Sequence, residues 1–177
     1  MFAAATPVGL TQALAVTTMK PSPFSHWSDW NHRRSLSNLR FPGVYALAVT
    51  TESLAGVPFQ WRPDIAYFGM TNSLSGLLGR LKQFDNTIIG KTGHGGAERF
   101  MHDFTSSADL SPLLYVAVWP FECDVSAGTP KDLITMGCVA KAEYECLAKF
   151  VDMFGRLPKY NDKKNSPKLK KAIRGDG

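Results

Sequence analysis

The sequence has few cysteines and no long apolar segment. Only three of its 177 residues are cysteine, and no two of them form a C-x-x-C pair. This excludes a disulfide framework, a zinc ribbon and a thioredoxin-type pair, and reduced thiols in a cytoplasmic protein are the simplest interpretation. No apolar run reaches the roughly 18 residues that a membrane helix needs. Residues 1–19 are uncharged and lack the basic start of a secretory signal, so we expect a loosely ordered arm or one short helix, and no membrane partner.

Several catalytic motifs are also missing. Gly90-Lys91-Thr92 resembles the end of a phosphate-binding P-loop, but Asp85 stands where that motif needs a glycine. His94 lies between glycines with no neighbouring Cys/His set, so a structural zinc site is not expected there. No G-x-S-x-G nucleophile motif occurs. These absences argue against an ATPase, a zinc enzyme and a serine hydrolase.

The composition is that of a globular protein with many turns. Hydrophobic residues make up 44% of the chain and charged residues 20%, which is ordinary for a folded domain. The 15 glycines and 11 prolines argue against an all-helical bundle. We expect one domain over residues 41–161, preceded by an arm and lead-in over residues 1–40 and followed by a tail over residues 162–177.

Hydrophobic patterning predicts an α+β fold. Apolar, β-branched and aromatic runs indicate strands, and apolar residues at helical spacing indicate helices. The expected strands cover residues 43–50, 65–69 and 113–119, and the expected helices cover residues 72–84, 97–104 and 130–154. A short helix is also expected near Ser35–Leu39. This order predicts a central three-stranded, mainly antiparallel sheet flanked by helices, as in an α/β sandwich.

The first long helix has leucines at helical spacing. Leu74, Leu77, Leu78 and Leu81 follow the i, i+3, i+4, i+7 pattern and predict one buried face. Arg80 lies among them, and a surface charge is its simplest interpretation. This helix is therefore expected to pack on the sheet through its leucines.

One carboxylate in the last helix lies on its apolar face. Glu143 is four residues after Val139 and three, four and seven residues before Cys146, Leu147 and Phe150. A carboxylate in an apolar setting costs free energy unless it is paired or binds a cation. A salt bridge to a neighbouring arginine and a metal-binding role both remain open.

In this order the residues resemble the GIY-YIG endonuclease family. The resemblance rests on Gly43-Val44-Tyr45, Tyr67-Phe68-Gly69, Arg80, Glu143 and Asn161, and it covers about residues 41–161. It implies an α/β sandwich with a central three-stranded antiparallel sheet. It also implies a metal-dependent endonuclease that hydrolyses DNA phosphodiester bonds, of the restriction or mobile-element kind.

The resemblance also implies a role for each site residue. Glu143 would hold one divalent ion, Mg²⁺ or Mn²⁺, with Glu145 as the fallback ligand. Tyr45 would act as the general base or position the attacking water, and Tyr67 would help to hold the water or the phosphate. Arg80 would pair with phosphate oxygens, and Asn161 would fix the site wall by hydrogen bonding.

The sequence departs from the family pattern in four places. Arg80 comes about three residues later after Tyr67-Phe68-Gly69 than is common, and the spacing from Glu143 to Asn161 is longer than in compact members. The two tripeptides are separated by residues 46–66, a longer interval than is usual in the family. Phe84 stands where many members carry a histidine or tyrosine, and either His94 or His102 is a candidate to replace it. The inserted loops over residues 50–64 and 85–96 are candidates for reading DNA bases, with His94 as a predicted nucleic-acid contact.

Positive charge is concentrated at the end of the chain. The formal net charge is +5, yet the segment from Gly155 to Gly177 alone holds eight basic and two acidic residues. Such a segment attracts nucleic acid, although it could simply be a solvated tail. The predicted nucleic-acid contacts in this tail are Lys163, Lys164, Lys168, Lys170 and Lys171.

Two other functions stay open, and one assembly is expected. The fold could be a catalytically inactive nucleic-acid-binding domain, which the absence of a histidine at Phe84 favours. It could also be a protein-interaction domain with no nucleic-acid role. If both DNA strands are cut at a specific site, we expect a homodimer, because palindromic sites match two-fold symmetry.

Overall fold

In the part of the chain that the structure describes, the sheet has four antiparallel strands and not the expected three. The computed structural model describes residues 23–91 and 93–168. In it the strands follow the order β1 (Ser28–Asp29), β4 (Leu114–Pro120), β2 (Gly43–Val49) and β3 (Ile65–Thr71). The α+β class and the antiparallel β2–β3 pair are confirmed. The predicted number of strands was wrong, because the short β1 pairs with β4 from a segment that has no strand pattern.

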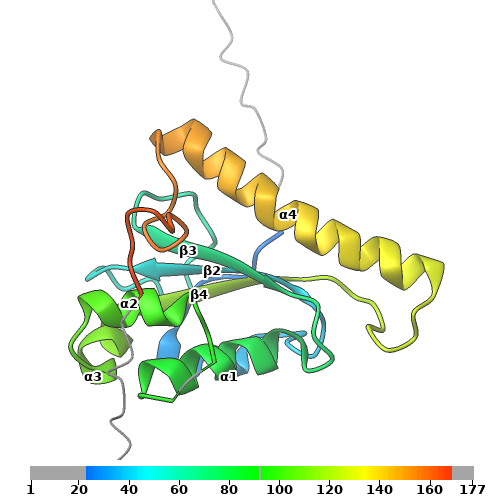
Figure 1. Ribbon diagram of the computed structural model, residues 1–177, viewed down its shortest axis with the longest axis horizontal. Helices are drawn as coiled ribbons and strands as arrows, with labels where there is room; N and C mark the ends of the chain where they lie inside the picture. Colours follow the sequence, from blue (N-terminus) through cyan, green and yellow to red (C-terminus); the bar gives the residue numbers. More distant parts are fainter. Residues whose placement is uncertain (1–22, 92, 169–177) are drawn as a thin grey trace, which may run out of the picture.

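The two faces of the sheet carry separate apolar cores. Side chains alternate between the faces of a strand, so neighbouring residues of β2 point in opposite directions. Tyr45 and Leu47 belong to one core, and Val44 and Ala46 belong to the other. The result is a sheet buried on both sides (Figure 1).

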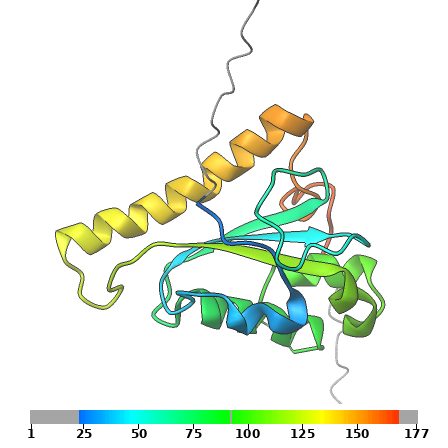
Figure 2. The ribbon, with the colours of Figure 1, turned by 180° about the vertical axis from the view of Figure 1, so that it is seen from behind.

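Helices cover both faces. α1 (Gly76–Ile88), α2 (Ala97–Asp103) and α3 (Ser107–Leu110) lie on the side of Tyr45, together with the 3₁₀ turn η2 (Ser111–Leu113). Of the helices in the described residues, α4 (Pro130–Phe154) is the one on the opposite side, as Figures 1 and 2 show. Among the residues that the structure describes, no helix is both long and apolar enough to cross a membrane.

α1 begins later than expected, and its buried face differs from the predicted one. Gly76 has a φ of +57° and turns the chain into the helix after a bend that starts at Ser73. Leu74 therefore precedes the helix and is 75% exposed, and Leu78 is 45% exposed. The buried stripe consists of Leu77, Leu81, Phe84 and Ile88. The i, i+4 spacing was right, but the stripe runs toward the helix C-terminus.

The lead-in contributes to the core. Phe24, Trp27 and Trp30 are buried, and Trp30 packs edge-to-face on Phe84 at a ring separation of 5.1 Å. The short helix expected near Ser35–Leu39 is instead a 3₁₀ helix, η1 (Trp30–Ser35). Its N-cap is the Asp29 side chain, which accepts a hydrogen bond from the His32 N–H.

α4 has the predicted bounds. Thr129 caps its N-terminus, Pro130 occupies the first turn, and Gly155 ends it with a φ of +68°. Residues 156–166, called here the return segment, then run along the free edge of β3, where the Tyr160 N–H donates to the Ala66 carbonyl. This return segment covers an edge that would otherwise expose unpaired backbone groups.

Candidate active site at the edge of the sheet

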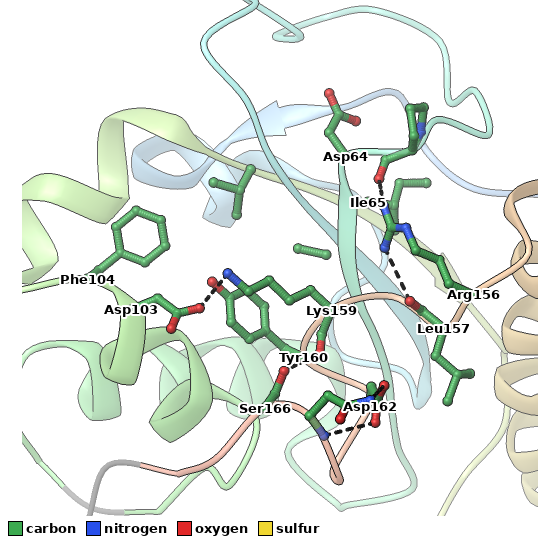
Figure 3. A pocket seen from close by; sticks show the side chains of 14 residues that line it. Asp64, Ile65, Asp103, Phe104, Arg156, Leu157, Lys159, Tyr160, Asp162 and Ser166 are labelled. Atoms are coloured by element: carbon green, nitrogen blue, oxygen red, sulfur yellow. Dashed lines mark hydrogen bonds and ion pairs between the residues drawn. The ribbon is translucent and has the colours of Figure 1, made fainter.

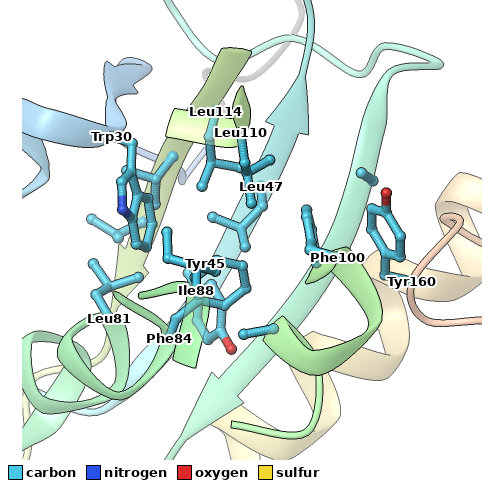
Figure 4. Close-up of a cluster of buried hydrophobic side chains, with 14 of the residues drawn as sticks. Trp30, Tyr45, Leu47, Leu81, Phe84, Ile88, Phe100, Leu110, Leu114 and Tyr160 are labelled. Atoms are coloured by element: carbon cyan, nitrogen blue, oxygen red, sulfur yellow. The ribbon is translucent and has the colours of Figure 1, made fainter. Parts of the chain in front are cut away.

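Two tyrosines lie side by side on neighbouring strands. Tyr45 on β2 and Tyr67 on β3 have ring centroids 6.0 Å apart, and both face the α1–α2 layer. Tyr45 is fully buried and Tyr67 is partly buried (Figure 4 shows Tyr45 between the sheet and the helices). Burial raises the pKa of both hydroxyls, and that of Tyr45 rises well above the value of free tyrosine. Both phenols therefore keep their protons at neutral pH.

Gly69 leaves the space that Tyr45 occupies. It lies opposite Tyr45 in the β2–β3 register. A Cβ atom at this position would lie 2.5 Å from Tyr45 Cζ and 2.7 Å from Tyr67 Cε1, and it would also meet the Tyr45 hydroxyl. The second glycine of the paired tripeptides is thus required by the tyrosine arrangement itself.

Arg80 reaches the tyrosines from α1. Its guanidinium lies close enough for its charge to oppose the rise in the pKa of Tyr45 and of Tyr67 that burial causes. Nη1 donates to Gln83 Oε1 over 3.1 Å, while Nε is buried without a hydrogen-bond partner among the described residues. Arg80 therefore faces the site with unused donor capacity.

Glu143 approaches from the opposite layer, on α4. Burial raises the pKa of its carboxyl, and the positive charges of Arg80 and Lys163 partly offset that rise. Its negative charge in turn contributes to the raised pKa of Tyr67, behind burial. Glu143 forms no hydrogen bond or ion pair within 4 Å with any residue in the described part of the chain, so the salt-bridge interpretation fails there.

The fallback carboxylate points elsewhere. The Glu145 side chain is 59% exposed and pairs with Lys141 over 3.4 Å along the solvent side of α4. Of the two acidic candidates, Glu143 is the one beside Tyr67 and Arg80. A single free carboxylate suits Mg²⁺, which binds proteins through one or two carboxylates and keeps several waters. Within the described ranges no group of three or more His, Cys, Asp or Glu side chains is arranged to hold a metal.

Asn161 holds the edge of β3. Its Oδ1 accepts from the Phe68 N–H and its Nδ2 donates to the Phe68 carbonyl, each over 2.8 Å. The amide therefore pairs with the strand as another strand would, directly beside Tyr67. It fixes the wall of the site and does not point a free group into it.

His94 does not lie on a nucleic-acid-binding surface, and that prediction needs correction. Its side chain is fully buried beneath the loop that joins α1 to α2. Its Nε2 lies 2.8 Å from the Tyr45 hydroxyl. His102, the other histidine considered, lies at the end of α2 and contacts Asp103. Of the two, His94 is the one that reaches the tyrosines.

Gly96, close to His94 in the sequence, is consistent with the buried position of His94 beside the tyrosines. A Cβ atom on Gly96 would lie 2.8 Å from Tyr67 Cζ and 2.9 Å from His94 Cε1. Glycine beside a histidine thus marks a backbone that passes close to other side chains. The sequence gives this signal locally, but it does not reveal that the contact partner lies 49 positions earlier, at Tyr45.

Basic side chains border the site. Of the predicted tail lysines, Lys163, Lys164 and Lys168 are exposed, whereas Lys170 and Lys171 lie outside the described residues. The charge of Lys163 acts on Glu143, and Lys168 pairs with Glu98 over 3.2 Å near the start of α2. Positive charge therefore lies beside the cluster formed by Tyr45, Tyr67, Arg80 and Glu143.

A separate cavity lies at the other end of the β3 edge. It measures about 620 Å³ and is bounded by the start of β3, the end of α2 and the return segment (Figure 3). Its charged groups already have partners: Lys159 pairs with Asp103 over 2.7 Å, and Asp162 accepts from the backbone N–H groups of Lys164 and Asn165. The side chains of Tyr45, Tyr67, Arg80 and Glu143 do not line this cavity.

Comparisons with protein-family models, curated proteins and solved structures found no match to this chain.

Proposed function

We propose that this protein is a metal-dependent endonuclease of the GIY-YIG type that hydrolyses DNA phosphodiester bonds. The observation that carries the proposal is the convergence of Tyr45, Tyr67, Arg80 and Glu143 at one edge of the sheet. They come from β2, β3, α1 and α4, so four elements from three layers supply one cluster. The order and types of these residues match the family pattern on which the resemblance rests.

The cluster has the groups that phosphodiester hydrolysis needs. The reaction requires an oriented water, neutralisation of the charge that builds on the phosphate, and a stabilised leaving oxygen. The planar guanidinium of Arg80 can donate two parallel hydrogen bonds to phosphate oxygens, and its buried Nε has no other partner among the described residues. Tyr67, less buried than Tyr45, is placed to hold the water or a phosphate oxygen.

Glu143 would hold the divalent ion. Its carboxylate is free of hydrogen bonds and ion pairs with the described residues, and a metal would relieve the cost of keeping this charge half-buried. Bound there, Mg²⁺ or Mn²⁺ would polarise the scissile phosphate and stabilise the leaving oxygen. Lys163 beside this carboxylate, and the rest of the basic tail, would add salt-dependent contacts to the DNA backbone.

Cleavage of supercoiled plasmid DNA with Mg²⁺ or Mn²⁺ tests the proposal. The full chain should cut, Glu143→Gln should not, and Glu145→Gln should cut as the wild type does. The two substitutions are matched, since both neutralise a carboxylate of α4 two residues apart. Discrete fragments would indicate a sequence-specific enzyme, for which a homodimer stays a prediction. Undiminished cutting by Glu143→Gln would contradict the metal assignment.

A specific observation also favours a non-catalytic DNA-binding domain. Burial raises the pKa of both tyrosines, which opposes the removal of a proton by either of them. A protein that binds DNA with strong salt dependence, and that cuts nothing with either metal ion, would support this second function. Equal cutting by the wild type and Glu145→Gln, together with inactive Glu143→Gln, excludes it.

A further inference from the structure

The buried His94 ring is held in one hydrogen-bonding state by the backbone. Its Nδ1 lies 3.1 Å from the backbone nitrogen of Gly96 and 3.1 Å from that of Ala97. Both nitrogens are N–H donors, so Nδ1 must present its lone pair to them and cannot carry a proton. The His94 N–H itself donates to Thr87 Oγ1 over 3.0 Å, which anchors the loop to α1.

The surroundings keep the ring neutral. The groups that face it are the Tyr45 hydroxyl, the Tyr67 ring, Arg80 from α1, and Lys168, which is paired with Glu98 of α2. Burial, with smaller contributions from the positive charges of Arg80 and Lys168, lowers the pKa of His94 to about 3. A neutral imidazole with an unprotonated Nδ1 carries its one proton on Nε2.

We infer that His94 is a fixed hydrogen-bond donor that orients Tyr45, and that it is not a proton acceptor in the reaction. Nε2–H donates to Tyr45 Oη over 2.8 Å, so the proton of Tyr45 must point to a different group. This inference rests on the proposed nuclease function for its catalytic meaning. His94 is then a positioning residue, because it acts on the site through Tyr45.

The Tyr45 hydroxyl donates a hydrogen bond to the neighbouring Tyr67. Burial raises the pKa of Tyr67, and a hydrogen bond from Tyr45 works against that rise, as expected where Tyr67 is the acceptor. The direction of donation thus runs from the Gly96 and Ala97 backbone through His94 and Tyr45 to Tyr67. A proton taken from water cannot end on His94, because one ring nitrogen already carries a proton and the other already accepts two N–H groups.

The inference makes two variants of His94 behave differently. In His94→Gln the amide nitrogen can replace Nε2–H as a donor to Tyr45, without a group that titrates. In His94→Phe the ring volume is kept and the donor is lost. We expect kcat of the Gln variant to stay within about tenfold of the wild type and that of the Phe variant to fall by about ten- to a hundredfold, with little change in KM. His102→Gln is the surface control and should change neither constant.

The two possible roles of His94, general base or positioning donor, also lead to different pH profiles of activity. If His94 accepted the proton, activity would show a titration in the range of ordinary histidine, about pH 6 to 7, and the Gln variant would lose as much activity as the Phe variant. We expect no such titration in the wild type, and the same profile in His94→Gln. Equal losses in the two variants would overturn the inference.

Nitrogen-15 NMR of the histidine rings in the full chain decides the tautomer without any activity assay. The four histidines are assigned by comparison with His94→Gln and His102→Gln. The His94 signals should show an unprotonated Nδ1 and a protonated Nε2, unchanged from pH 5 to 8. A protonated Nδ1, or titration within this range, would overturn the inference. If the predicted tautomer is found and the wild type cuts no DNA, the nuclease proposal fails while the orientation of Tyr45 by His94 stands.

Discussion

Replacement of Gly69 by alanine tests whether the tyrosine pair depends on one missing side chain. Gly69 has no positive φ, so alanine can adopt its backbone conformation and only the space for a methyl group matters. The added Cβ would lie 2.5 Å from Tyr45 Cζ and 2.7 Å from Tyr67 Cε1. Carbon atoms in favourable contact are about 3.5–4.0 Å apart, so the Tyr45 ring must move by about 1 Å.

Such a shift has two costs. Overpacking in a well-packed core costs about 1–3 kcal/mol. The movement also disturbs the 2.8 Å contact between the Tyr45 hydroxyl and His94, a net loss of about 1 kcal/mol. We expect the free energy of unfolding to fall by about 2–4 kcal/mol, which lowers Tm by roughly 4–16 °C in a chain of this size. A misplacement of about 1 Å at a reacting group reduces activity by about a hundredfold.

Thermal unfolding and plasmid cleavage measure the two effects. Gly137→Ala is the matched control, because a Cβ atom there meets no atom within 4 Å and the residue lies on the exposed side of α4. Alanine in a helix is favoured over glycine, so this control should gain up to about 1 kcal/mol in stability and keep its activity. A Gly69→Ala protein with the Tm and kcat of the wild type would refute the reasoning.

Two further predictions follow from charge. Glu143→Gln should raise Tm at pH 7. Burial raises the pKa of Glu143 in the folded state, so the ionised carboxylate opposes folding at neutral pH. Differential scanning calorimetry should show that this gain in Tm disappears as the pH falls below the ordinary pKa range of glutamate. An equal gain at pH 3 would contradict this assignment. Lys163→Gln should lower the slope of log Kd against log salt for DNA binding by about 1, measured by fluorescence anisotropy, while Lys131→Gln at the start of α4 should leave the slope unchanged.

The long elements were predictable because their signals are local. Strand patterns at Gly43–Val49 and Ile65–Thr71, and the caps Thr129 and Gly155 of α4, gave these elements nearly their observed bounds. Glu143 was identified by its position on an apolar helix face. Such signals depend on residues within one or two turns, so a single sequence contains them.

The errors arose where distant contacts decide the structure. β1 consists of two residues whose partners in β4 lie 86 and 88 positions away, and no local pattern marks it. Leu74 fitted the helical spacing but lies before Gly76, whose positive φ shifts the start of α1. His94 was predicted to contact DNA because it lies in the inserted loop over residues 85–96, whereas its side chain is buried and hydrogen-bonded to Tyr45.

The Phe84 side chain helps to explain why His94, from the loop between α1 and α2, can hydrogen-bond to Tyr45. Its side chain is fully buried and packs edge-to-face on Trp30, Phe100 and His94, each at 5.1 Å between ring centroids. A polar ring in that place would lie among aromatic side chains and need a hydrogen-bond partner there. The phenyl ring of Phe84 instead packs against the His94 imidazole. The loop can then place an imidazole against Tyr45 while its Nδ1 is satisfied by backbone N–H groups.

Arg80 and Glu143 each break an ordinary burial rule at the same edge of the sheet, although Trp27 Nε1 and Asn72 Oδ1 are also buried without a partner among the described residues. Buried polar atoms nearly always have a hydrogen-bond partner, yet Arg80 Nε has none among the described residues. Glu143 keeps a half-buried carboxylate with no ion pair to them, and its pKa is raised by burial. Each group alone reduces stability, and a ligand that carries anionic oxygens together with a cation could pair with the exposed part of the Arg80 guanidinium and offset the charge of Glu143. A metal-bound phosphodiester has this composition, so the unfavourable burial of Arg80 and Glu143 argues for the proposed substrate.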